Sequence, residues 1–190
     1  MTSFIKEVLE DLKNKNADFS KLTFILPSKR AGTVLRNELS KLFNKTFFAP
    51  DILSIEEFIE ELSNLKTLSN IELLFSFYNV YLDSTEKQYQ ESFDTFSKWA
   101  QIILQDFNEI DRYLINPKHV FDYLLEIQKI NTNHWSIEKN QSDFTKRYLK
   151  FWSKLNHFYN EFSNILISSG VGYQGLIYRE AVENLENYIQ

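Results

Sequence analysis

Two neighbouring cations, Lys29 and Arg30, lie at the boundary between a predicted strand and a predicted helix. The strand is the apolar run 22–26, and Pro27 ends it. A helix amino terminus carries partial positive charge and prefers anions, so two cations in its first turn favour a bound anion. The backbone N–H groups of such a turn suit a phosphate. The chemistry that this segment predicts is therefore phosphate binding at a strand-to-helix turn.

Ser28 and Arg36 are the nearest further candidates, because Ser28 precedes the two cations and Arg36 follows on the same helix. A second interpretation needs no ligand. An acidic cluster at residues 56–61 could pair with Lys29 and Arg30 as ordinary surface residues. Chemistry alone leaves both interpretations open.

Several kinds of active site are absent from the sequence. There is no phosphate-binding loop G-x-x-x-x-G-K-[ST], no Rossmann glycine fingerprint, no kinase signature and no Ser–His–Asp order. The chain has no Cys, which excludes a disulfide framework and a cysteine zinc site. Ser28 has no neighbouring base that would make it a nucleophile. We therefore expect no cofactor, and no enzymatic activity for this chain alone.

The remaining ligand types do not form a metal motif either. The three histidines, His119, His134 and His157, lie on different expected elements without metal spacing, so each is expected to be structural or exposed. Three carboxylates lie close together on one long helix: Asp106, Glu109 and Asp111. A metal pair is conceivable there, but a solvated helix face is the better expectation.

The composition suits a globular protein with a sizeable core. The chain has 190 residues, 43% of them hydrophobic, and a net charge of −5, which disfavours a generic nucleic-acid-binding surface. Nine Lys/Arg against five Asp/Glu make residues 1–50 the only basic part. No apolar run approaches the length of a membrane span and the amino terminus is no signal peptide, so a cytoplasmic protein without membrane contact is expected.

The abundant aromatic residues have two explanations. There are 17 Phe, 10 Tyr and 3 Trp. They could form a base-stacking surface. Most of them recur at helical spacing on apolar faces, however, which favours rings that fill helical cores.

Hydrophobic periodicity predicts a predominantly helical α/β protein. Residues 22–65 read as strand–helix–strand–helix, with the second strand at 52–53 and Ser54 as the cap of the following helix. A continuous apolar strand of this kind is typical of a parallel sheet. The pattern is purely helical from residue 69 onward. The domains expected are an α/β subdomain at 1–66, a helical insertion at 67–170, and a helix at 171–190 that returns toward the α/β subdomain. Two strands make no stable sheet alone, so either further strands from outside these 190 residues complete the sheet or the sheet is a minimal appendage on a helical body. We expect the first, with the natural polypeptide continuing.

The segments Ser28-Lys29-Arg30-Ala31-Gly32 and Ala49-Pro50-Asp51-Ile52-Leu53-Ser54-Ile55-Glu56-Glu57-Phe58 resemble the amino-terminal region of AddB/RexB-type subunits of bacterial helicase–nucleases. The likeness is greatest to large Bacteroidetes proteins with a PD-(D/E)XK nuclease domain at their far end. Two later stretches fit the same family: residues 93–114, with Phe93-Asp94 and Ile110-Asp111, and residues 175–180, Gly175-Leu176-x-Tyr178-Arg179-Glu180.

The resemblance implies a first domain like that of UvrD-type motors, often inactive as an ATPase, with a helical insertion. In that frame residues 28–32 match a turn that touches single-stranded DNA, and Ser54 falls where motors carry a Thr-Phe-His segment. The DNA-binding residues implied are Ser28, Lys29, Arg30, Arg36 and Ser54. Ile55 and Glu56 depart from the motor pattern, and neither the Walker A loop nor the nuclease motif is present in this sequence.

Two hypotheses about function follow. In the first, the chain is a helicase-like segment of a helicase–nuclease used in double-strand break repair and recombination. It guides single-stranded or end DNA beside an AddA-like helicase subunit or downstream domains of its own polypeptide. In the second, it is a helical scaffold that binds such a partner without touching DNA.

Overall fold

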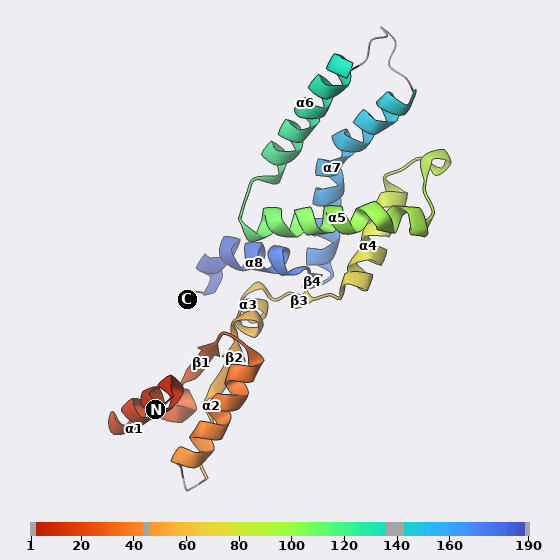
Figure 1. Ribbon diagram of the computed structural model, residues 1–190. Coiled ribbons are helices and arrows are strands. Elements are labelled where there is room, and N and C mark those ends of the chain that lie inside the picture. The colour runs from red at the N-terminus through yellow and green to blue at the C-terminus, as the bar shows by residue number, and fades with distance from the viewer. Residues whose placement is uncertain (1–2, 44–45, 136–142, 189–190) are drawn as a thin grey trace. The chain divides into compact units, whose positions relative to one another are not determined.

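The computed structural model describes residues 3–43, 46–135 and 143–188; side chains are described for 3–43, 46–130 and 149–186. The chain forms two compact units, residues 1–62 and 63–190 (Figure 1). Each unit has its own hydrophobic core.

The first unit is a small α/β structure. Its elements are α1 (Phe4–Asn14), β1 (Thr23–Leu26), α2 (Lys29–Leu42), β2 (Asp51–Ser54) and α3 (Ile55–Ser63). β1 and β2 pair in parallel, with Leu26 opposite Ser54. This confirms the strand–helix–strand–helix order read from the periodicity.

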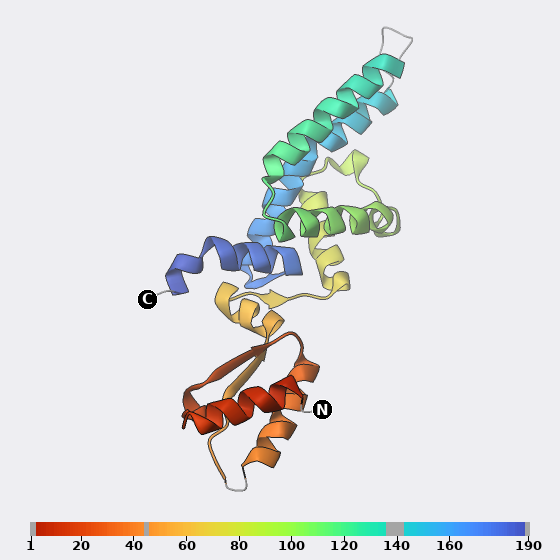
Figure 2. The ribbon, with the colours of Figure 1, turned by 60° about the vertical axis from the view of Figure 1, so that its left-hand side comes forward.

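One face of this sheet packs on α1 and α2 (Figure 2). Leu9 of α1 and Leu35 and Leu39 of α2 are buried, and Phe24 and Ile52 of the strands pack against them. Gly32 allows α2 to lie close to β2, because a Cβ at Gly32 would come within 3.2 Å of Ile52 Cγ2. The core therefore fixes the start of α2 beside the ends of the strands.

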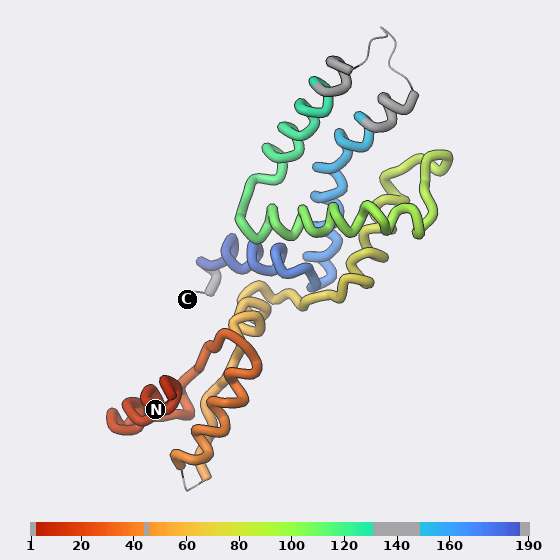
Figure 3. The backbone as a smooth tube through the Cα atoms, viewed as in Figure 1, coloured from red at the N-terminus to blue at the C-terminus, as the bar shows by residue number. Residues whose placement is uncertain are grey.

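The second unit is predominantly helical. Its main elements are α4 (Asn70–Asp83), α5 (Phe93–Arg112), α6 (Pro117–Trp135), α7 (Asp143–Ser168) and α8 (Gln174–Glu183), followed by the short helix η3 (Leu185–Tyr188). Helix α6 packs along α7, and α8 packs along α5, as the backbone trace shows (Figure 3). Ser69 and Glu72 form a capping box at the start of α4, and the side chain of each accepts from the other's backbone N–H.

Aromatic rings fill the core of this unit. Phe77 is fully buried and contacts four other phenylalanine rings. Their ring centroids lie 5.2–6.1 Å from that of Phe77: Phe96, Phe107, Phe158 and Phe162. Most of these pairs are tilted or edge-to-face, the arrangement that aromatic rings prefer. The helical spacing of the aromatics therefore correctly indicated a packed core.

A second parallel pair, β3 (Lys66–Thr67) and β4 (Val171–Gly172), is not predicted by the sequence pattern. Each strand has only two residues, too few for an alternating pattern. The pair joins segments more than a hundred residues apart and ties the start of α4 to the end of α7.

The domain limits differ from those expected. The first unit ends at residue 62 rather than 66, and residues 171–190 lie in the same compact unit as 67–170. The reason is tertiary contact, since β4 pairs with β3 and α8 packs on α5. In coarse terms the predicted fold class holds: a predominantly helical chain with a small parallel sheet.

Candidate functional site

The predicted turn lies at the carboxyl edge of the parallel sheet in the first unit. β1 leads through Ser28 into α2, and β2 leads through Ser54 into α3. Because the strands are parallel and Leu26 is level with Ser54, both strand-to-helix turns meet at this edge. Open α/β sheets bind their ligands outside the carboxyl ends of their strands.

Ser28 caps α2. Its Oγ accepts a hydrogen bond from the N–H of Ala31 at 3.3 Å, and its backbone has the extended conformation of a cap residue. Ser28 is exposed. Its position beside the first turn agrees with the prediction, and its side chain has a structural task there.

Ser54 also caps a helix, as predicted, but it is only 2% exposed. Its N–H and Oγ both donate to Glu57 Oε2 at 2.9 Å, and its Oγ accepts from the N–H of Glu57 at 3.2 Å. The hydroxyl is thus used in a capping box. Because Ser54 is buried and its hydroxyl both donates to and accepts from Glu57, it is poorly placed to contact a ligand directly.

Lys29 has a partner in the acidic cluster. Its Nζ lies 3.1 Å from Oε1 of Glu57. The hydrogen bond from the N–H of Ser54, the contact with Lys29 and the Ser54 hydroxyl lower the pKa of Glu57 to about 2. The hydrogen bond with Glu57 in turn raises the pKa of Lys29. Both groups are therefore fully charged at neutral pH. For Lys29, the interpretation as an ordinary surface residue paired with the acidic cluster is correct.

Arg30 and Arg36 remain as exposed cations on α2. Neither forms an ion pair with any residue that the structure describes. Arg36 Nη1 would lie 3.8 Å from a Cβ on Gly32, so the guanidinium reaches back one turn toward the start of the helix. These two arginines are the groups at this edge best placed to meet an anion.

The described His, Asp and Glu side chains do not form a metal-binding cluster. Among the residues described, no three His, Asp or Glu side chains lie close enough to hold a metal ion. His119 and His157 are exposed, and the side chain of His134 lies outside the described residues. The expectation of a solvated face holds for Asp106 and Glu109, which are exposed, but is wrong for Asp111.

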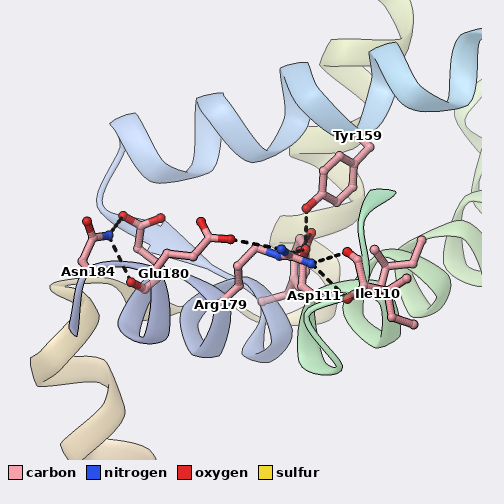
Figure 4. A network of polar contacts seen from close by, with 9 residues as sticks. Ile110, Asp111, Tyr159, Arg179, Glu180 and Asn184 are labelled. Atoms are coloured by element: carbon pink, nitrogen blue, oxygen red, sulfur yellow. Dashed lines mark hydrogen bonds and ion pairs between the residues drawn. The ribbon is translucent and has the colours of Figure 1, made fainter. Parts of the chain in front are cut away.

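Asp111 is completely buried at the centre of a polar network in the second unit (Figure 4). Its carboxylate accepts hydrogen bonds from the hydroxyls of Tyr159 and Tyr173, and from Arg179 Nε at 2.6 Å. Arg179 Nη2 also donates to the carbonyl oxygens of Ile110 and Ile115, at 3.1 and 2.6 Å. The network joins the end of α5 to α7, to the cap residue Tyr173 of α8 and to α8 itself.

The tyrosines of this network are held protonated. Burial, together with the hydrogen bond to the Asp111 carboxylate, raises the pKa of Tyr159. Burial beside the same charge raises the pKa of Tyr173 well above its ordinary value. Two neutral donors and one guanidinium thus surround one carboxylate, which is the composition of a satisfied structural ion pair.

Sequence reasoning missed this network, although a signal existed. Asp111 is four residues beyond Phe107 and next to Ile110, so it continues the buried stripe of α5. A close backbone contact lies beside it: Asn108 Oδ1 accepts from the N–H of Gly175 at 2.8 Å, and a Cβ at Gly175 would come within 2.2 Å of the Asn108 carbonyl oxygen. Thus residues 93–114 and 175–180 meet in space.

Comparison with known proteins adds no identification: neither a family model nor a curated protein sequence matches this chain. Within the described ranges, none of the helices has both the length and the apolar character needed to cross a membrane.

Proposed function

We propose that the first unit contacts the phosphate backbone of a DNA strand at the carboxyl edge of its parallel sheet. The observation that carries this proposal is a pair of exposed arginines on the helix that begins at this edge, Arg30 and Arg36, which have no ion-pair partner among the residues described. Arginine suits phosphate because its guanidinium offers several fixed donors. The amino end of α2 adds N–H groups of the same polarity.

The role proposed for the whole protein follows from the family resemblance. The chain would be the helicase-like amino-terminal part of an AddB-type helicase–nuclease in double-strand break repair. It would be inactive as an ATPase and would work with an AddA-like subunit or downstream domains. Its own residues would hold or guide a strand, whereas strand cutting would belong to a nuclease domain elsewhere in the parent protein.

We rank the candidate residues by their exposure and pairing. Arg30 and Arg36 are proposed as the principal phosphate contacts. Lys29 would contribute only after exchanging Glu57 for a phosphate oxygen, because its Nζ already lies 3.1 Å from that carboxylate. Ser28 and Ser54 would act through the caps that fix the two turns.

A salt titration of single-stranded DNA binding tests the proposal. The double variant Arg30→Ala/Arg36→Ala should bind more weakly, and the slope of log K against log salt should flatten by about 1.4, since each lost contact on a single strand removes about 0.7. Lys41→Ala is the matched control, because Lys41 is an exposed cation on the same helix that is already paired with Glu38 at 2.7 Å. Equal slopes for wild type and the double variant would overturn the assignment.

A second candidate function is a scaffold that binds a partner subunit and no DNA. The observation that favours it is the Lys29–Glu57 pair, which neutralises one of the two predicted cations. The first unit as a whole carries nine Lys/Arg against ten Asp/Glu, so its basic end is balanced by α3. Absence of DNA binding at low salt, together with capture of the purified downstream segment, would select the scaffold.

A further inference from the structure

Lys29 and Arg36 share one face of helix α2. They are seven residues apart, which is two helical turns, so their side chains leave the helix on the same side. The Arg36 side chain points back toward the start of α2, where its Nη1 lies 3.8 Å from a Cβ position at Gly32. Both cations therefore lie on the side of α2 that meets the second strand-to-helix turn, since Lys29 contacts Glu57 and Gly32 packs against Ile52.

An anion already occupies this place. Oε1 of Glu57 lies 3.1 Å from Lys29 Nζ. The other carboxylate oxygen, Oε2, accepts from the N–H and the hydroxyl of Ser54 at 2.9 Å. Because the capping box uses only Oε2 of this carboxylate, Glu57 can give up Lys29 and still cap α3. Glu57 is therefore an exchangeable anion beside Lys29, and its exchange costs one exposed ion pair.

Further carboxylates limit how much phosphate can approach this place. The hydrogen bond and the charge of Glu57 raise the pKa of Lys29, and the charges of Glu60 and Glu56 act in the same direction. Glu61 adds a fourth carboxylate to α3. A DNA strand that continued past α3 would bring successive phosphates toward these carboxylates, and like charges repel. A strand that ends beside α2 presents one phosphate without that repulsion.

The charge of the phosphate decides the exchange with Glu57. An internal phosphodiester carries one negative charge, the same as the carboxylate that it must replace. A phosphomonoester carries about 1.5 to 2 negative charges at pH 7, because its second pKa is about 6. It is therefore attracted to Lys29 and Arg36 more strongly than either monoanion.

We propose that the phosphate bound by Lys29 and Arg36 is a terminal phosphomonoester, which takes the place of Glu57 beside Lys29. The rest of the strand passes Arg30, which lies about 100° further round the helix than Lys29. The inference rests on the DNA contact proposed above and names the ligand as a strand end. A free nucleoside monophosphate carries the same group and would fit the same two cations.

Competition binding with matched single strands tests this inference. The probes are an oligothymidine with hydroxyls at both ends and the same strand with a 5′-phosphate or a 3′-phosphate. Wild type should bind at least one phosphorylated strand about two- to fivefold more tightly than the unphosphorylated strand, the effect of one exposed charge pair. Lys29→Gln should abolish this preference. Lys41→Gln, at an exposed cation paired with Glu38 on the same helix, is the control and should keep it.

Glu57→Gln gives a second readout. Without the charge of Glu57, Lys29 is available to any phosphate, so the unphosphorylated strand should bind more tightly and the preference should narrow. Thymidine monophosphate and thymidine, used as competitors, identify the source of the group. The nucleotide should compete better than the nucleoside, and it should match the phosphorylated strand only if a free nucleotide is the ligand.

Two results would overturn this inference: equal binding of all three strands by wild type, or a preference that survives in Lys29→Gln. If wild type binds the three strands equally and Arg30→Ala/Arg36→Ala binds none of them, the proposed backbone contact stands and only the terminal phosphate is wrong. If wild type binds none of the strands, both proposals are wrong.

Discussion

The two units each hold one notable ion pair, and the two pairs differ in almost every respect. Lys29 and Glu57 are 72% and 36% exposed, and they join the starts of two helices at a sheet edge. Asp111 and Arg179 are 0% and 14% exposed, and they join helices in the aromatic core. In the second pair the additional donors reach the same carboxylate and two nearby carbonyl oxygens, and Arg179 Nη1 also donates to Glu183 at 3.1 Å.

This difference separates a pair that can exchange partners from one that cannot. Exposed pairs contribute little to stability, because water and salt screen them, so an incoming phosphate can replace the carboxylate. A buried pair has lost its hydration, and removing one partner leaves the other charge without compensation. Binding chemistry is therefore expected at Lys29–Glu57, and structural specificity at Asp111–Arg179.

The largest effect is expected from breaking the buried pair. Asp111→Ala leaves Arg179 without its carboxylate and deprives the hydroxyls of Tyr159 and Tyr173 of their acceptor. The free energy of unfolding should fall by about 3–5 kcal/mol, measured by urea unfolding of the full chain. Glu109→Ala, at an exposed residue on the same turn of α5, is the control. A loss below about 1 kcal/mol for Asp111→Ala would show that the buried pair is no more important than a surface pair.

An intermediate effect is expected at alkaline pH. The pKa of Tyr159 is raised above its usual value of 10, so the folded state favours the protonated hydroxyl. The stability that this group contributes is fully present below pH 10 and is lost as the pH rises through its folded pKa. Tyr159→Phe removes this titration, so its melting temperature should decline less steeply between pH 10 and 11.5.

Tyr123→Phe is the matched control for this pH series, since Tyr123 is exposed. Its alkaline profile should follow that of wild type. Parallel profiles for wild type and Tyr159→Phe would contradict the role given to the buried hydroxyl.

The smallest effect on stability, but a gain in binding, is expected from the exposed pair. Glu57→Gln keeps a side chain that can complete the capping box and removes the charge that holds Lys29. Its melting temperature should stay within about 2 °C of wild type. Its affinity for single-stranded DNA at low salt should rise several-fold, with a salt slope steeper by about 0.7.

The second capping box offers the control for this variant. Glu72 caps Ser69 in the same way, but its described contacts include no lysine. Glu72→Gln should therefore leave DNA affinity unchanged. Equal affinities for both variants would mean that releasing Lys29 has no consequence for binding.

Local signals explain most of what the sequence predicted correctly. The helix cap at Ser54 and the apolar stripes of the long helices depend on residues within a few positions of one another. The candidate turn was located for the same reason. The pairing of Lys29 with Glu57 remained one of two open interpretations, because it depends on the approach of two helices 28 residues apart.

Sequence alone thus determined the helices, the parallel strand order and the position of the two cations, since propensity, capping and periodicity act over short range. Only the tertiary structure decided which charged side chains are buried or paired and which remain exposed. It turned Asp111 from an expected surface carboxylate into the centre of a buried network, and it paired Lys29 while leaving Arg30 and Arg36 exposed. The physical reason is that burial and ion pairing depend on which distant segments pack together, and a charge's chemistry depends on both.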